Sequence, residues 1–161
     1  MSAARLGAVL AEELGKLPGE EPWRGEVLRR AAAFQNALRL GGIDAVLAAS
    51  TKLVGLGEGS TPAGDDYLVG VLHALAPSGR EGARESLVAA LAGIGEGRTT
   101  AASAAWLAAA ARGEPTPVWR ALLDALASGD EPEVRRAARA VRGTGHTSGA
   151  FSLRGFLDTL T

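Results

Sequence analysis

Residues 55–72 of the chain read GLGEGSTPAGDDYLVGVL, and the interpretation of the whole sequence depends on this stretch. A glycine-rich loop is followed by a Thr-Pro step, two adjacent aspartates and an apolar stripe. Gly59 and Gly64 have the G-x-x-x-x-G spacing of a phosphate-binding loop, but Asp65 stands where such a loop needs lysine. Two carboxylates after Gly64 would repel phosphate, and no strand–loop–helix context surrounds them. We therefore reject a nucleotide-binding loop of this type.

The same stretch predicts the start of a helix. Thr61 is expected to be the N-cap, with Pro62 at the first helical position, where its missing N–H costs nothing. Asp65 and Asp66 fall in the opening turns, where the helix dipole favours negative charge by about 1 kcal/mol or less. Asp65 prolongs the apolar stripe on the inward face, whereas Asp66 is in register with His73. A buried aspartate needs a donor cluster, an arginine or a cation as its partner.

Composition limits the classes of function. A chain of 161 residues with a net charge of -1 is long enough for one packed domain and has no basic surface for nucleic acid or anionic membranes. No apolar run is long enough to span a bilayer, and the N-terminus lacks a secretory signal. The absence of cysteine excludes disulfides and thiol chemistry. We expect a cytoplasmic protein.

Helical periodicity dominates the sequence. Helices are predicted at about 6–17, 27–38, 44–50, 65–76, 81–93, 98–112, 117–127, 131–142 and 149–160. Residues 52–56 could be extended, but one short run makes no sheet. The predicted fold is all-α: a single compact, bundle-like domain over residues 1–161 with eight or nine helices.

An internal repeat is the clearest feature of the organisation. Residues 63–72 and 148–157 place a small residue, Gly, Leu, Gly, an apolar residue and Leu at matching offsets. Each segment follows a glycine- and threonine-rich loop, GLGEGSTPAG in the first case and GTGHTSG in the second. Two loop–helix units of one design predict paired helices whose N-termini face a shared space.

The second loop offers groups for binding and for proton transfer. His146 lies between glycines in a loop at a helix N-terminus, and Thr147 and Ser148 offer hydroxyls. Free backbone N–H groups at this point could hold a carboxylate or a phosphate. His73, inside its helix, is expected to be a packing or surface residue instead.

A third stretch, GEGRTTAASAAWLAAAARGE at 95–114, is almost wholly alanine and serine after its start. Thr99 or Thr100 is expected to cap this helix, whose small side chains suit a central position. Arg98, at the N-terminal end of this helix, could hold an anionic substrate through two hydrogen bonds, or could be a solvated loop residue.

A metal site is an open alternative at this point. Adjacent aspartates point about 100° apart on a helix, so both cannot easily bind one ion. Neither histidine is spaced from another ligand as in known metal motifs. A Mg²⁺ ion held by Asp65 and waters is the one arrangement that the sequence leaves open.

Three stretches together, GLGEGSTPAGDDYLVG, RTTAASAAWLAAAARGE and GHTSGAFSLRGFL, resemble the AllH-type family of oxamate carbamoyltransferase subunits. The family patterns are GLGPGLTPSGDDFLxG and GHTSGxDLLAGL, and the resemblance covers residues 52–161. It implies a role in carbamoyl transfer between oxalurate and phosphate during purine (allantoin) degradation, within a multi-subunit assembly. The matching positions are Gly57, Gly59, Thr61, Pro62, Gly64, Asp65, Asp66, His146, Thr147, Ser148 and Gly149.

Some features depart from the family pattern. Family members are longer, with a strand-rich region before the part that is shared. Glu58 replaces the usual proline, and Phe151 replaces the acidic residue that follows the second loop. A short chain without that acid implies a lost or changed reaction.

The sequence therefore supports two hypotheses. In the first, the chain binds a small anionic metabolite and takes part in carbamoyl transfer within a complex, with Asp65, Asp66 and His146 as the catalytic groups. The substrate-binding residues would be Gly57, Gly59, Thr61, Gly64, Arg98, Thr147, Ser148 and Gly149, with Lys52 as an alternative cation to Arg98. In the second, the chain is a non-catalytic helical subunit or ligand-sensing module in a homo-oligomer or a complex. A third reading keeps both loops as helix-capping turns only.

Overall fold

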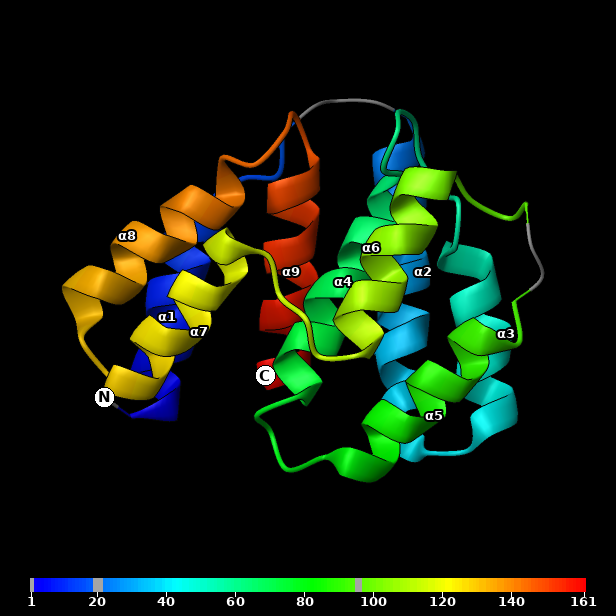
Figure 1. Cartoon of the computed structure of the whole chain (residues 1–161), viewed down its shortest axis with the longest axis horizontal. Helices are drawn as coiled ribbons and strands as arrows, with labels where there is room; N and C mark the ends of the chain where they lie inside the picture. Colours follow the sequence, from blue (N-terminus) through cyan, green and yellow to red (C-terminus); the bar gives the residue numbers. More distant parts are fainter. Residues whose placement is uncertain (1, 19–21, 95–96) are drawn as a thin grey trace.

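Two paired helices, α4 (Ala63–Leu75) and α9 (Ser148–Leu160), run through the middle of the molecule (Figure 1). The computed structural model describes residues 2–18, 22–94 and 97–161. Within it, α4 and α9 share a more extensive interface than any other two helices. The pairing that the internal repeat predicts is thus confirmed.

Two glycines allow these helices to touch through their backbones. A Cβ atom on Gly70 would overlap the carbonyl oxygen of Ser152, and one on Gly155 would overlap that of Tyr67. Gly70 and Gly155 occupy equivalent positions of the two repeated units, as do Tyr67 and Ser152. The two contacts are therefore related by an approximate two-fold axis between α4 and α9.

The remaining helices form a group on each side of this pair (Figure 1). Among the described residues the fold is all-α, with nine helices and no strands. The other seven helices are α1 (Ala3–Leu14), α2 (Pro22–Leu40), α3 (Ile43–Leu53), α5 (Glu81–Ala92), α6 (Ala101–Ala111), α7 (Pro117–Ser128) and α8 (Glu131–Arg142). Helices α2, α3 and α5 lie on one side with α6 against α4, whereas α1, α7 and α8 lie on the other. None of the helices in the described ranges is long and apolar enough to cross a membrane.

Each side has its own apolar core. One cluster joins α2, α3, α4, α5 and α6, and the other joins α1, α7, α8 and α9. Phe151 of α9 inserts into the first cluster and Ala74 of α4 into the second, so each central helix contributes to both. The apolar stripe predicted for α4 is fully buried, while the corresponding stripe of α9 ends at Leu160, which is 40% exposed.

Three local expectations were wrong. Helix α3 continues to Leu53, so residues 52–56 are not an extended segment. Pro62 rather than Thr61 is the N-cap residue of α4, because the Thr61 hydroxyl bonds to Ser148 across the helix pair. The alanine-rich helix α6 is capped by Thr100 but lies at the surface, where only Ser103, Leu107 and Ala110 are buried.

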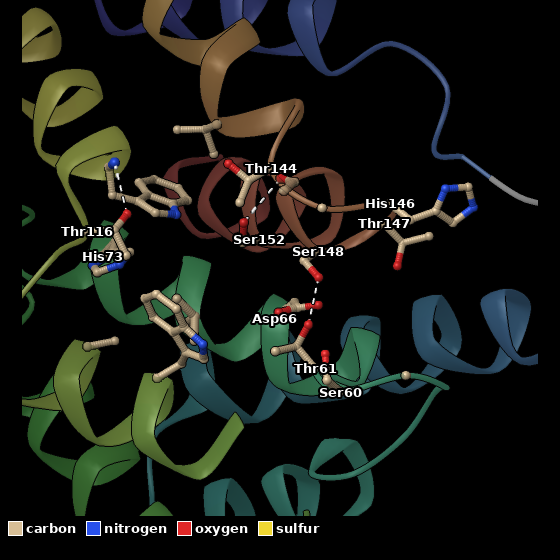
Figure 2. A pocket seen from close by; sticks show the side chains of 18 of the residues that line it. Ser60, Thr61, Asp66, His73, Thr116, Thr144, His146, Thr147, Ser148 and Ser152 are labelled. Carbon is tan, nitrogen blue, oxygen red and sulfur yellow. Dashed lines mark hydrogen bonds between the residues drawn. The ribbon is translucent and has the colours of Figure 1, made fainter. Parts of the chain in front are cut away.

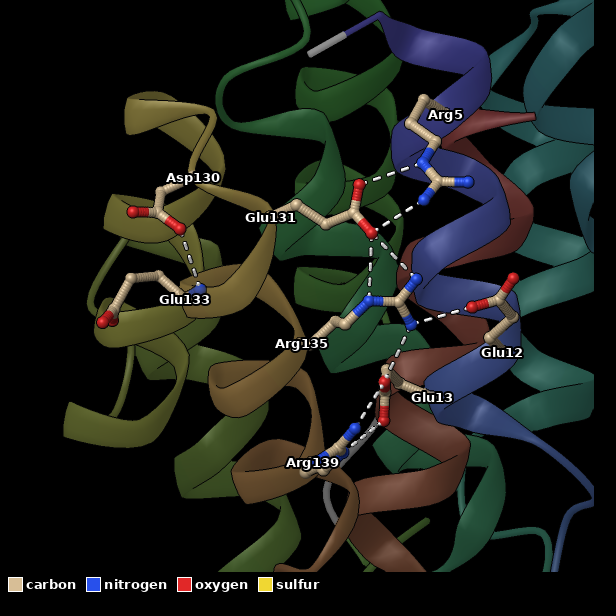
Figure 3. Close-up of polar contacts among 8 residues, drawn as sticks. All are labelled: Arg5, Glu12, Glu13, Asp130, Glu131, Glu133, Arg135 and Arg139. Carbon is tan, nitrogen blue, oxygen red and sulfur yellow. Dashed lines mark hydrogen bonds and ion pairs between the residues drawn. The ribbon is translucent and has the colours of Figure 1, made fainter.

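Ion pairs fasten α1 to α8 (Figure 3). Arg135 of α8 donates to Glu13 of α1 at 3.1 Å and to Glu131 of its own helix at 2.9 Å. Glu131 also accepts from Arg5, and Glu13 also accepts from Arg139, at 2.8 and 2.6 Å. The Glu13 side chain is only 9% exposed, and hydrogen bonds from Arg139 lower its pKa. A connected network of this kind stabilises more than isolated surface pairs do.

The close approach of α4 and α9 predicts the effect of a single methyl group. Gly70→Ala should lower the free energy of unfolding by about 3 kcal/mol or more, because backbone atoms must move apart to admit the Cβ. Gly25→Ala in α2, where no atom lies within 4 Å of the new Cβ, should raise it by up to about 1 kcal/mol. Urea unfolding of both variants measures the difference, and equal effects would contradict the backbone contact.

Candidate functional site

A cavity of about 560 Å³ lies at the N-terminal ends of α4 and α9 (Figure 2). Both repeated loops line it, and the hydroxyl oxygens of Thr61 and Ser148 meet there at 2.7 Å. The two loops are separated by more than 80 residues in the sequence (|i−j| = 87 for this bond). The α4–α9 pairing is what brings them to one place.

The cavity gathers part of the residue set predicted from the sequence. Those that line it are Gly59, Thr61, Asp66, His146, Thr147, Ser148 and Gly149. Those that do not line it are Gly57, Gly64, Asp65 and Arg98. The predicted set therefore divides between the cavity wall and the surrounding scaffold.

Asp66 is the buried acid of the cavity wall. It lies in the first turn of α4 and is 8% exposed, and its Oδ2 atom has no hydrogen-bond partner among the described residues. Burial raises the pKa of Asp66 to about 7; the charge of Asp65 adds to this, and the hydroxyls of Ser148 and Thr61 oppose it. A carboxyl group with this pKa can carry or release a proton near neutral pH.

Asp65 has a different environment although it is the next residue. It is fully buried, and its Oδ1 accepts from the Gly55 N–H at 2.9 Å. Its Oδ2 accepts from the hydroxyls of Thr99 and Ser103, the latter at 2.8 Å. Asp65 thus has the donor cluster that a buried carboxylate needs, and it ties the end of α3 and the start of α6 to α4.

Aromatic side chains form the other part of the wall. All three tryptophans of the chain, Trp23, Trp106 and Trp119, line the cavity. His73, two turns after Asp66 on α4, packs against Trp119 with ring centroids 4.8 Å apart. Burial lowers the pKa of His73 to about 4, so its imidazole is neutral at physiological pH.

His146 lies at the opposite end of the cavity from His73 (Figure 2). It is exposed in the loop before α9, and its ring points away from Asp66 and Ser148. The distance between the two ends shows that His73 and His146 flank the cavity rather than form a pair.

The electrostatic character of the cavity is acidic. Glu58, Asp66 and Glu114 line it, whereas no lysine or arginine is among the described lining residues. Arg98 instead donates to the Thr51 carbonyl at 3.1 Å and borders a second, apolar cavity between α5 and α6. Lys52 is exposed on α3. Within the described ranges, no cluster of three or more histidine or acidic side chains could hold a metal ion.

The predicted glycines serve the backbone in two ways. Gly57 has a φ of 118°, and a Cβ atom there would overlap the backbone N of Ala63. Gly64 and Gly149, at equivalent positions of the repeat, press against the carbonyl oxygens of Leu53 and Val141. At the start of α4 the N–H groups of Gly64, Asp65 and Asp66 all donate to carbonyls of this chain. The first turn of α4 therefore offers no anion cradle.

Sequence reasoning missed the aromatic part of the wall. The tryptophans lie on α2, α6 and α7, and no spacing in the sequence connects them. His73 was expected to pack or to be exposed; it does pack, but it also faces the cavity. The sequence signal for this was the seven-residue spacing of Asp66 and His73, which places both side chains on the same face of α4.

Asp65→Asn tests the scaffold role of the first aspartate. The amide of asparagine would place its own N–H donors against the Gly55 N–H and the Thr99 and Ser103 hydroxyls, which are donors to Asp65. The free energy of unfolding of the variant should therefore be about 3 kcal/mol lower than that of the wild type. Chemical denaturation at pH 7 measures this loss. Wild-type stability in Asp65→Asn would contradict the hydrogen-bonded arrangement.

Asp66→Asn tests the perturbed titration. Because the pKa of Asp66 is raised from 3.8 to about 7 on folding, the folded chain binds an extra proton in this range and wild-type stability falls as pH rises. The uncharged variant should therefore gain stability relative to wild type from pH 4 to 7, by up to about 4 kcal/mol. The opposing effect of His73, which destabilises as pH falls below 6.5, is common to both proteins and cancels.

Denaturant midpoints measured across this pH range give the stability difference between the two proteins. Asp124→Asn on the exposed face of α7 is the matched control and should show a constant difference. A constant difference for Asp66→Asn as well would contradict the raised pKa.

Comparison with known proteins identifies the family. Residues 53–160, about two thirds of the chain, match the family model described as oxamate carbamoyltransferase subunit AllH. No curated protein and no solved structure matches the chain. The matched region includes both loops of the cavity, and the chain belongs to the AllH family.

Proposed function

We propose, from membership of the AllH family, that this chain is a subunit of an oxamate carbamoyltransferase assembly and holds the substrate in the cavity between α4 and α9. One observation carries the proposal. Two matched loops, distant in sequence, line a single cavity that also contains a buried acid whose pKa is about 7. The other subunits of the assembly are the partners of this chain.

The reaction requires a proton at a defined atom. In transfer from oxalurate to phosphate, a phosphate oxygen bonds to the carbamoyl carbon and the bond from that carbon to the oxamate nitrogen breaks. The nitrogen then takes up one proton, and the products are oxamate and carbamoyl phosphate. The reverse transfer removes the same proton.

Asp66 is our candidate for this proton transfer. At neutral pH about half of its carboxyl groups carry a proton, which suits a group that acts in both directions. The charge of Asp65 helps to keep this pKa high, so Asp65 contributes by position and not by contact with the substrate. His146 at the open end is a second group able to exchange protons with solvent.

Substrate oxygen atoms are proposed to lie at the start of α9. Thr147, Ser148 and Gly149 line the cavity there, and the positive end of the helix dipole favours a carboxylate or a phosphate. The Gly149 N–H already donates to the Thr144 carbonyl at 2.9 Å, so the hydroxyls of Thr147 and Ser148 are the groups proposed to meet the ligand. The first turn of α4 carries Asp65 and Asp66, whereas the first turn of α9 carries no acidic residue. We therefore propose that α9, rather than α4, faces the anionic part of the ligand.

The alternative function is a non-catalytic, ligand-sensing subunit. The acidic lining of the cavity favours it, because the described wall gives phosphate no cationic side chain. The replacement of an acid by Phe151, which lies in the apolar core, favours it as well. In this reading the cavity reports the metabolite to subunits that carry out the transfer.

Binding and turnover distinguish the two functions. All three tryptophans line the cavity, so oxalurate, oxamate or carbamoyl phosphate should change the intrinsic fluorescence of the chain in a saturable way. In the assembly purified through a tag on this chain, Asp66→Asn should lower phosphate-dependent cleavage of oxalurate about 100-fold or more. Asp124→Asn should leave it unchanged.

Each outcome decides between the proposals. Saturable binding together with full turnover by Asp66→Asn would support the sensing subunit and overturn the catalytic role. No fluorescence response to any of the three metabolites at millimolar concentration would overturn binding in the cavity.

A further inference from the structure

Two polar atoms in the wall of the cavity have no hydrogen-bond partner among the described residues. They are the Oδ2 atom of Asp66 and the Nε1 atom of Trp23, both shielded from solvent. The third atom of this kind in the described part of the chain, Nε of Arg84, belongs to a residue that does not line this cavity. The hydroxyls of Thr61 and Ser148 lie beside the Asp66 carboxyl group, but they bond to each other at 2.7 Å. Buried polar groups are nearly always paired in native proteins, so two such atoms in one cavity point to a ligand that can pair with both.

The two atoms have opposite hydrogen-bonding character. The indole N–H of Trp23 can only donate, and a carboxylate oxygen of Asp66 can only accept. A ligand that satisfies both must offer an acceptor and a donor. An amide or ureido group does so with its carbonyl oxygen and its N–H, whereas a carboxylate or a phosphate dianion offers acceptors alone.

The charge of the wall leads to the same choice. The other carboxylates that line the cavity are those of Glu58 and Glu114, both exposed, and Asp65 lies directly beside Asp66 in the chain. An anionic group placed against Asp66 would be repelled and would leave its burial uncompensated. An uncharged planar group meets no such penalty, and the surrounding indole rings offer it flat apolar faces.

We propose that the cavity recognises the uncharged carbamoyl or ureido end of its ligand, with N–H donated to Asp66 and the carbonyl oxygen accepting from Trp23. This inference rests on the proposed function and deepens it. The carboxylate end of the ligand then lies toward the start of α9.

Trp23 gives this arrangement a distinctive feature. It lies on α2, outside residues 53–160 that match the family, and its ring is held against Phe151 with centroids 5.7 Å apart. The donor to the carbonyl oxygen is therefore supplied by a helix that precedes the family region. Phe151 stands where the family pattern has an acidic residue. Its ring packs against Trp23 and so helps to orient the indole.

Three probes of related shape test the proposal by calorimetry at pH 8. Oxalurate has both ends, acetylurea replaces its carboxylate by a methyl group, and pyruvate has a carboxylate without an amide. Acetylurea should bind within about tenfold of oxalurate, and pyruvate should bind at least about tenfold more weakly than acetylurea. Carboxylate recognition predicts the reverse order for acetylurea and pyruvate and would overturn the inference.

Two variants assign the contacts. Asp66→Asn and Trp23→Phe should each weaken acetylurea binding about fivefold to tenfold, since the first replaces a charged acceptor by a neutral amide and the second removes the indole donor. The matched control is Asp124→Asn on the exposed face of α7, outside the cavity. It should change the affinity less than about twofold, and thermal unfolding of each variant verifies that it is folded. Unchanged affinity in Asp66→Asn and Trp23→Phe would overturn the assigned contacts.

The inference and the proposed function can fail separately. Acetylurea binding that depends on Asp66 and Trp23, in a chain whose assembly cleaves no oxalurate, would retain the inference and refute the transferase role. Cleavage of oxalurate without any binding of acetylurea would do the opposite.

Discussion

The backbone contact between α4 and α9 is the constraint on which the rest of the structure depends. Gly70 and Gly155 allow each helix to reach the carbonyl groups of the other, and any side chain at either position would separate them. The same contact brings two loops from distant parts of the chain together at the N-terminal ends. Without it, Thr61 and Ser148 could not meet, and the cavity would have no second wall. The glycine contacts between α4 and α9 thus bring together the two loops that line the cavity.

Asp65 and Asp66 show how two neighbouring carboxylates can serve different purposes. The turn of the helix directs one toward a cluster of donors and the other toward the cavity. The carboxylate oxygens of Asp65 accept hydrogen bonds from Gly55, Thr99 and Ser103. Burial, together with the charge of Asp65, raises the pKa of Asp66 to about 7. A structural acid can in this way adjust a reactive one without touching the ligand.

Much of the fold was predictable from the sequence because its signals are local or repeated. The 3.6-residue periodicity and the Gly and Pro stop signals predicted eight or nine helices, and the described residues form nine at these places. The internal repeat predicted the α4–α9 pair. The N-cap of α4 was predicted wrongly, at Thr61 instead of Pro62, because a tertiary bond from Thr61 to Ser148 competes with local capping. The site was only partly predictable. Asp66 and its register with His73 can be read from one helix, but the tryptophans come from three helices and are assembled only by packing.

The ion pairs between α1 and α8 have a consequence for the biosynthesis of the chain. Helices α2 to α5 can pack around α4 soon after they leave the ribosome, since their contacts lie within the same half of the sequence. The partners of α1, in contrast, follow about 120 residues later, as in the pairs of Arg5 with Glu131 and Glu13 with Arg139 (|i−j| = 126). At typical translation rates the apolar face of α1 waits on the order of 10 s for α8. Helix α1 can therefore form these ion pairs only after α8 has been synthesised.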